Sequence, residues 1–262
     1  MNRSGPKGTY NAPALEKAFE IIELLATRPG GLPLTDISAG LGRSVGELFR
    51  IVIVMEKHGY LQKSELTDKY TVAYKMLDLA FRATPSQELS AAATGPMEAL
   101  SEAIGQSCNL VVLNGGQGLV IARQEQPGTR SFILKLGAAI DLLRSCSGHV
   151  LLAFSPAERV DRLISLAEAL PDARPYDRAA LNANIEKVRQ NGYDSRKSPI
   201  TFGVTDISFP IFGFDGGIVA ALTIPFLELI DGSQKVDIQA ARHALQMSAS
   251  KISDRLGHVS SA

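Results

Sequence analysis

The chain contains few of the residues on which several protein classes depend. It has no tryptophan and only two cysteines in 262 residues, and its 27 basic and 27 acidic side chains give a formal net charge of zero. Cys108 and Cys146 match no metal-ligand spacing and exclude a disulfide scaffold, as expected in a reducing cytosol. Because there is no net charge, only a local patch could attract nucleic acid or a membrane.

Long apolar runs are absent as well. No segment reaches the roughly 18 apolar residues that a membrane span requires, and the first residues, MNRSGPKGTYNAP, lack the apolar region of a signal peptide. We therefore expect a cytoplasmic protein without a membrane partner. Because 45% of the residues are hydrophobic, the chain can still form one large core or two smaller ones.

The first third of the chain has the pattern of a helix-turn-helix. Residues 1–12 are polar and predict a mobile arm, and from residue 13 to about 27 apolar positions recur at helical spacing. A short second helix is expected over 33–41, with Thr35 as its N-cap. The tight connection GLGRS that follows is typical of the turn between two such helices.

The third helix, within SVGELFRIVIVMEKHGYL, has two different faces. Ser44 and Glu47 stand at capping-box spacing, which predicts a helix start at Val45. Helical spacing then predicts a buried stripe of Leu48, Ile51, Val52 and Met55. The opposite face carries Gly46, Arg50, Ile53 and Lys57.

A β-hairpin and a further helix complete this region. GYLQKSELTDKYTV predicts two short strands around a turn at about 65–68, and AYKMLDLAFRA predicts a helix. The order of elements is that of a winged helix-turn-helix domain over 13–75. A linker helix and a domain boundary are expected over 76–86.

Residues 87–262 have the mixed pattern of an α/β or α+β domain. Strands are expected in CNLVVLN, GLVIARQE, SFILKL, VTDISFPIF and GIVAALTIPF. Helices are expected over about 87–105, 155–170, 177–193 and 234–257. Ser155 should cap the second of these helices, and Gly192 should close the third.

Signatures of enzymes are missing: the chain has no G-x-S-x-G, H-E-x-x-H or P-loop motif. Cys146 and His149 are close enough in sequence to suggest a nucleophile and its base. A buried thiol and a structural histidine at a helix start are the favoured interpretation. We expect neither catalytic residues nor a cofactor nor a metal.

Several segments, taken in order, resemble the IclR-type transcriptional regulators. They are ALEKAFEIIELLA, LTDISAGLG, FRIVIVMEKHGYL, SCSGHVLLAFSP, IEKVRQNGYD and GVTDISFPIFGFDGGIVAALTIP, and the resemblance extends over about 12–257. It implies an α+β protein with an N-terminal winged helix-turn-helix domain and a C-terminal GAF-like α/β effector-binding domain. It also implies assembly as a homodimer or a dimer of dimers. Where the family commonly has a hydroxyl residue early in the recognition helix, this chain has Gly46.

The resemblance and the helix-turn-helix spacing favour DNA binding over a merely solvated helix surface. A recognition helix places its N-terminal residues nearest to the bases. The basic excess is small, since residues 1–80 hold ten Lys and Arg against nine Asp and Glu. We therefore expect two or more copies to bind a palindromic operator together. The expected DNA-binding residues are Arg43, Ser44, Gly46, Glu47, Arg50, Lys57, Lys63 and Lys69.

The resemblance also implies an effector pocket beside the segments KLGAAIDLLRSCSG and GYDSRKSPITFGVTDISFP. Hydroxyl groups and a helix-start amide suit a small carboxylate. Asp206 would oppose an anion unless it points away, and several of these residues could instead cap turns. The expected effector-binding residues are Leu136, Gly137, Ser145, Ser147, Gly148, Ser198, Asp206 and Ser208.

The sequence thus predicts a ligand-responsive DNA-binding transcriptional regulator, repressor or activator, of a catabolic operon. Its effector would be a small organic acid or a related metabolite. The alternative is a GAF-like small-molecule-binding or enzymatic protein whose N-terminal domain only dimerises it. A structural module that binds neither DNA nor a ligand is a third interpretation.

Overall fold

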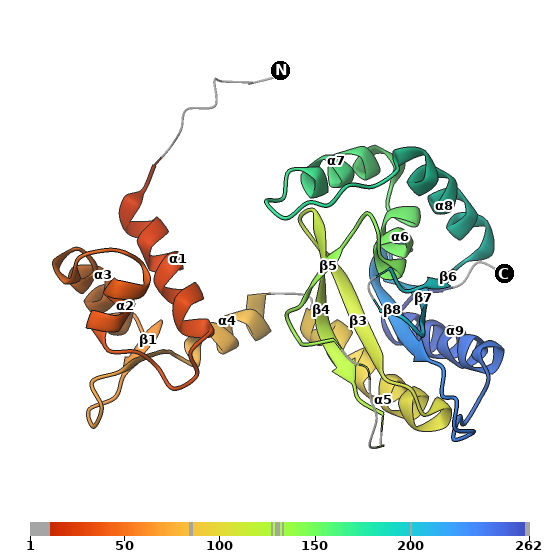
Figure 1. Ribbon diagram of the computed structural model, residues 1–262, viewed down its shortest axis with the longest axis horizontal. Coiled ribbons are helices and arrows are strands. Elements are labelled where there is room, and N and C mark those ends of the chain that lie inside the picture. The colour runs from red at the N-terminus through yellow and green to blue at the C-terminus, as the bar shows by residue number, and fades with distance from the viewer. Residues whose placement is uncertain are drawn as a thin grey trace. The chain divides into compact units, whose positions relative to one another are not determined.

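The computed structural model describes residues 11–83, 86–126, 128, 132, 134–199 and 201–259. The chain divides into two compact units, Met1–Thr84 and Pro85–Ala262 (Figure 1). The first contains α1 (Pro13–Ala26), α2 (Leu34–Gly40), α3 (Val45–Lys57), the hairpin β1 (Leu61–Lys63) and β2 (Tyr70–Val72), and α4 (Lys75–Ala83). Nearly all of the expected N-terminal arm lies outside the described residues.

The core of the first unit holds α3 by one face only. Leu48 and Val52 of α3 are fully buried and Met55 nearly so, in one cluster with Ile21 of α1 and Ile37 of α2. The buried stripe expected for α3 is therefore confirmed, with Ile51 packed at its margin. Packing on this face directs the opposite face of α3 toward solvent.

Two helix caps of the first unit differ in part from expectation. Pro33, with no side-chain bond, stands at the N-cap of α2, so the prediction of Thr35 as the cap was wrong. The Thr35 hydroxyl instead contacts the Asp36 carboxylate. Ser44 does cap α3, because its Oγ accepts the Glu47 amide N–H at 3.3 Å. Glu47 forms ion pairs with neighbouring cations, described below, in place of the reciprocal half of the capping box.

The second unit is a six-stranded antiparallel sheet covered by helices on both faces. Its strand order is β5-β4-β3-β8-β7-β6. The strands are β3 (Cys108–Asn114), β4 (Gln117–Gln124), β5 (Ala139–Asp141), β6 (Asp194–Lys197), β7 (Val204–Phe212) and β8 (Ile218–Leu227). The helices are α5 (Ser86–Ile104), α6 (Cys146–Ala153), α7 (Ala157–Glu168), α8 (Arg178–Asn191) and α9 (Ile238–Arg255). Figure 1 shows α6, α7 and α8 on one face and α5 and α9 on the other.

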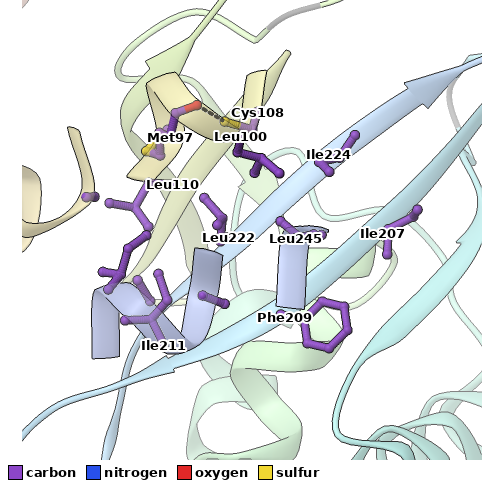
Figure 2. Close-up of a cluster of buried hydrophobic side chains, with 14 of the residues drawn as sticks. Met97, Leu100, Cys108, Leu110, Ile207, Phe209, Ile211, Leu222, Ile224 and Leu245 are labelled. Carbon is purple, nitrogen blue, oxygen red and sulfur yellow. Dashed lines mark hydrogen bonds between the residues drawn. The ribbon is translucent and has the colours of Figure 1, made fainter. Parts of the chain in front are cut away.

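Alternation along the strands builds a separate core on each face of this sheet. Leu110 of β3 and Leu222 of β8 pack toward α5 and α9, together with Met97 and Leu245 (Figure 2). The adjacent residues point the other way: Val111 follows Leu110 on β3, and Ala221 precedes Leu222 on β8. Both pack toward α6 and α7. The period of two therefore directs every second residue of β3 and β8 toward α6.

Two expectations for the second unit were wrong. SFILKL was expected to be a strand, but its described residues, Phe132 and 134–136, belong to none. Gly137 forms a turn at φ +76 and its N–H bonds to the Val120 carbonyl, so pairing with β4 begins only at Ala139. Ser155 does not cap α7, because its hydroxyl donates to the Leu151 carbonyl and Pro156 is the N-cap. Among the described helices, none is both long and apolar enough to cross a membrane.

Candidate nucleic-acid interface and ligand cavity

The exposed face of α3 presents cations that no other described group of the unit binds. Gly46, Arg50, Ile53 and Lys57 are all exposed, as the helical spacing predicts. Within the described part of the chain, the side chains of Arg50 and Lys57 form no hydrogen bond or ion pair. Lys69, between the wing strands, is likewise exposed and unpaired there. These side chains can reach an external anion without first breaking an internal contact.

Two other predicted DNA-binding residues hold α3 against α1. Arg43 donates from Nε and Nη2 to the Glu20 carboxylate, both at 2.9 Å, and from Nη1 to Glu47 at 3.3 Å. Lys17 of α1 lies 2.6 Å from the same Glu47 carboxylate. The hydrogen bond to Glu20 raises the pKa of Arg43, and that from Lys17 lowers the pKa of Glu47. We call these contacts of Arg43 and Lys17 with Glu20 and Glu47 the clamp. It joins α1 to the start of α3 and so fixes the orientation of α3.

The remaining predicted residues of this surface have different environments. Gly46 faces open space, since a Cβ added there would find nothing within 4 Å. Ser44 uses its hydroxyl as the cap of α3. Lys63 pairs with Asp68 at 2.8 Å and lies over the Tyr70 ring. Of the eight predicted residues, therefore, Arg50, Lys57 and Lys69 present unengaged cations.

A cavity of about 590 Å³ opens in the second unit on the α6 side of the sheet. It lies between the sheet, the N-terminus of α6 and the segment that follows α7. Four expected residues line it, namely Ser145, Ser147, Ser198 and Asp206. Most of the remaining lining is apolar, including Leu134, Ile140, Leu142, Leu170 and Pro225.

The four other expected residues are not part of this lining. Leu136 is 60% exposed and Gly137 forms the turn described above. Ser208 is fully buried and its hydroxyl bonds to that of Thr223 at 2.8 Å. The Gly148 N–H is used by Ser145 Oγ, and a Cβ at Gly148 would stand 2.4 Å from the Leu142 carbonyl oxygen. Gly148 thus lets α6 approach the cavity wall but offers no free amide.

Sequence reasoning missed several polar residues of the cavity. Asn109 of β3 and Thr223 of β8 line it from the sheet, and Arg144 and Arg174 line it from the loops. Asn109 and Thr223 interrupt the apolar runs CNLVVLN and IVAALTIPF, which is the signal that could have found them. The two residues face one another because of the register between β3 and β8, and this register cannot be read from either run.

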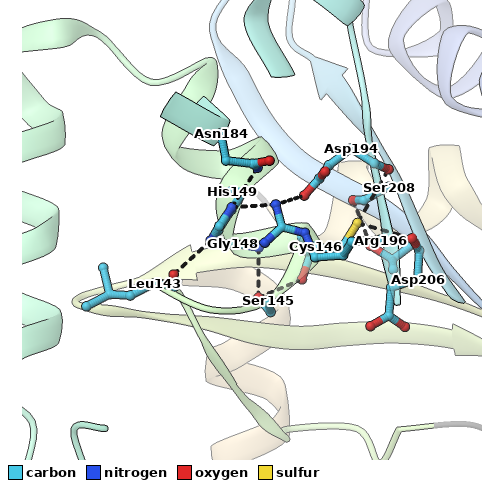
Figure 3. A network of polar contacts seen from close by, with 12 residues as sticks. Leu143, Ser145, Cys146, Gly148, His149, Asn184, Asp194, Arg196, Asp206 and Ser208 are labelled. Atoms are coloured by element: carbon cyan, nitrogen blue, oxygen red, sulfur yellow. Dashed lines mark hydrogen bonds and ion pairs between the residues drawn. The ribbon is translucent and has the colours of Figure 1, made fainter. Parts of the chain in front are cut away.

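A buried polar cluster lies behind the Cys146 wall of the cavity (Figure 3). His149 Nε2 meets the Leu143 carbonyl at 2.7 Å, while Asn184 and Arg196 approach Nδ1 at 2.8 and 2.6 Å. Arg196 also pairs with Asp194 at 2.5 Å. Burial and the adjacent Arg196 charge lower the pKa of His149 to about 4, so the ring is neutral. These contacts make His149 a structural acceptor for Arg196.

The two other titratable groups beside this cluster are also shifted by burial. Cys146 donates its thiol to backbone carbonyls of Asp194 and Asp206, and burial raises its pKa well above the usual value. A thiol in that state is a poor nucleophile. Burial also raises the pKa of Asp206. In Figure 3 the Asp206 carboxyl group points away from His149 and Asp194.

Comparisons with known proteins match both units. The family model of the IclR helix-turn-helix domain matches residues 14–65, and that of the bacterial transcriptional regulator IclR C-terminal domain matches residues 81–254. The regulator XynR of Escherichia coli is 23% identical over 94% of this chain and 97% of its own length. KdgR of the same organism is 24% identical over 92% of each.

Solved structures share the fold. The Thermotoga maritima IclR structure has a TM-score of 0.70 at 23% identity and covers 93% of this chain and 98% of its own. An IclR homolog from Microbacterium hydrocarbonoxydans, complexed with 4-hydroxybenzoate, has a TM-score of 0.76 at 20% identity with the same coverage. Both likenesses extend over the two units.

Proposed function

The chain belongs to the IclR family of bacterial transcriptional regulators, and from this premise we propose which of its residues bind DNA and effector. It is a regulator and not an enzyme, with a helix-turn-helix for DNA and an effector-binding domain, and its relatives include the glycerol operon regulatory protein of Streptomyces coelicolor. In our proposal α3 enters the major groove of a palindromic operator. Two copies of the chain bind the two half-sites.

The free cations of α3 carry the DNA-binding part of this proposal. Arg50 is exposed and unpaired within the described chain, and it lies opposite the buried stripe that fixes the helix. An arginine placed in this way can donate to a guanine edge or to a phosphate. Lys57 and Lys69 are suited to phosphates on either side. The clamp of Arg43 with Glu20 and Glu47 presents α3 to the groove.

The effector that best fits the cavity is a small organic acid with an apolar body. The lining is mostly apolar, and its two arginines have no described side-chain partner. Of its acidic residues, Asp141 accepts two backbone N–H groups and Glu168 accepts the Tyr176 hydroxyl, while Asp172 lies in the same exposed segment as Arg174. An acid would direct its carboxylate to Arg144 and Arg174, away from Asp206. The solved relative that contains 4-hydroxybenzoate supports an effector of this class.

A salt-dependent binding titration tests the proposal. The full chain is titrated with a duplex containing an inverted repeat from its own promoter region, at several salt concentrations. Phosphate contacts predict that the logarithm of the binding constant falls linearly with the logarithm of salt concentration. Equal affinity for a scrambled duplex would contradict operator recognition. The absence of any DNA binding would favour the alternative in which the N-terminal unit only dimerises the chain.

A further inference from the structure

Asn109 lines the cavity from the sheet. It lies on β3, where the register sets it opposite Thr223 of β8. Thr223 in turn faces Ser208 of β7, and Ser208 faces Asp194 of β6. Residues paired in this way share one face of a sheet. A polar row therefore crosses four strands of an otherwise largely apolar face, and Asn109 and Thr223 lie on the two central strands of the sheet.

Unlike the side chains of the other members of this row, that of Asn109 has no hydrogen-bonding partner among the described residues. Its side chain is 1% exposed, and within the described residues neither Oδ1 nor Nδ2 forms a hydrogen bond. Ser208 and Thr223 bond to one another, and Asp194 pairs with Arg196. Buried polar groups are normally satisfied, and each exception calls for an explanation. Since Asn109 lines the cavity, a bound molecule can supply both missing partners.

The chemistry around Asn109 restricts what that molecule can present. The amide offers one acceptor and two donor hydrogens, so its partner should both donate and accept a hydrogen bond. Asp206, which lines the same cavity from β7, disfavours a second carboxylate at this end. An uncharged hydroxyl group meets both conditions. The arginines that suit a carboxylate belong to the loops, at the more exposed part of the lining.

We propose that Asn109 binds the buried end of the effector, and that this end carries a hydroxyl group. The effector is then a hydroxylated organic acid, with its hydroxyl on the sheet and its carboxylate toward Arg144 and Arg174. This inference rests on the proposed effector site and specifies its ligand class. It also makes Asn109 the residue that distinguishes a hydroxy acid from the same acid without its hydroxyl.

Two related probes test this assignment on the full chain. 4-Hydroxybenzoate and benzoate differ only in the hydroxyl group, and their affinities are measured by calorimetry and by thermal shift. We expect the wild type to bind 4-hydroxybenzoate at least tenfold more tightly than benzoate. Asn109→Leu, which keeps the approximate size of the side chain, should abolish this difference. Asn109→Ala should do the same, so the test does not depend on one variant folding well.

Ser101 provides a matched control. Its hydroxyl is also buried without a described partner, but it lies on α5 and does not line the cavity. Ser101→Ala should leave the preference for 4-hydroxybenzoate unchanged. Without ligand, Asn109→Leu should unfold at the wild-type temperature or above, because it removes an unsatisfied buried amide. A clearly lower unfolding temperature for both Asn109 variants would reveal a structural partner and overturn the proposal.

The remaining outcomes separate this inference from the proposed function. Equal wild-type affinity for the two probes, or the absence of binding by either at millimolar concentration, would overturn the hydroxy-acid class. A tenfold preference that persists in both Asn109 variants would place the hydroxyl on another residue. Operator binding is measured separately without probe. Its absence would contradict the proposed DNA recognition, while the preference between probes would still decide the role of Asn109.

Discussion

At the scale of single residues, the charged side chains near α3 differ in whether a carboxylate already holds them. Arg50 is unpaired within the described chain, whereas Arg43 is held by Glu20 and Glu47. We expect Arg50→Ala to weaken operator binding by about 1–3 kcal/mol per half-site and to leave the unfolding temperature unchanged. Titration with the operator duplex and thermal denaturation measure the two effects.

Arg43→Ala is the matched comparison and should show a lower unfolding temperature, because it releases the carboxylates that join α1 to α3. Any loss of DNA affinity would then accompany a loss of stability. If Arg50→Ala instead unfolds the domain, the assignment of the exposed face is wrong. Normal operator binding by Arg50→Ala would mean that another element enters the groove.

His149 predicts a dependence of stability on pH. Its pKa is about 4 in the folded protein, against about 6.5 for a free histidine, because it is buried and accepts from Arg196. Between these values the unfolded chain binds more protons, so the free energy of unfolding falls as the pH is lowered from about 6.5 to 4. The contribution is on the order of 3 kcal/mol over this window.

The measurement is denaturant unfolding of wild type and His149→Gln at several pH values. Asp206, with its raised pKa, acts in the opposite direction at acid pH and is present in both proteins. The difference between the two curves therefore isolates His149. It should shrink as the pH falls. Parallel curves would show that His149 keeps an ordinary pKa.

At the scale of elements, substitutions of Gly46 test whether the first turn of α3 needs a glycine in order to approach DNA closely. An added Cβ meets nothing within 4 Å, and alanine is favoured over glycine in a helix by up to about 1 kcal/mol. Gly46→Ala should therefore raise the unfolding temperature. Gly46→Val should weaken operator binding more than it changes stability, because its side chain would stand between helix and groove. Unchanged DNA affinity in a titration of the valine variant would show that the glycine makes no close approach.

The elements also show which features sequence periodicity can predict. The long elements follow from it, because a stripe such as Leu48–Val52–Met55 records which side is buried. Caps are harder, since Ser44, Thr35 and Ser155 have similar chemistry and only Ser44 caps a helix. Tertiary contacts decide between them. The Ser155 hydroxyl donates to the Leu151 carbonyl of α6 instead of capping α7.

Part of the cavity lining was predictable, but its polar residues on β3 and β8 were not. Ser145, Ser147, Ser198 and Asp206 were expected from a family resemblance, and all four line the cavity. Asn109 lies in a hydrophobic run, and only the pairing of β3 with β8 shows that it faces the cavity beside Thr223. The sequence also did not show that Ser208 and Gly148 already have hydrogen-bonding partners. Ser208 bonds to Thr223, which is distant in sequence, and the Gly148 N–H bonds to Ser145, in the turn before α6.

At the scale of the whole molecule, the weak charge of the first unit requires more than one copy. Two α3 helices bound to one operator combine affinities that would be small singly. We expect at least dimers, with α4 contributing to the contact. Leu77 of α4 is 51% exposed, and the side chains of Ala80 and Phe81, expected beside it, lie outside the described residues. A monomeric mass in light scattering at micromolar concentration would contradict this prediction.

Regulation requires that the two units influence one another, and the cavity supplies the means of testing this. A ligand changes DNA affinity only by the difference between its affinities for the DNA-bound and free protein. We expect saturating 4-hydroxybenzoate to shift operator affinity by about 5- to 150-fold, the usual 1–3 kcal/mol of allosteric coupling. The measurement is an operator titration of the full chain with and without the probe, in both wild type and Asn109→Leu.

The Asn109→Leu protein serves as the control because its DNA-binding surface is unaltered. In the absence of probe it should bind the operator as the wild type does, and addition of the probe should change its affinity much less. By reciprocity, saturating operator must change the affinity of wild type for the probe by the same factor. A probe that binds the wild type tightly and leaves operator affinity unchanged would show that the cavity is not coupled to DNA. The direction of the shift also separates release of the operator by the acid from its retention.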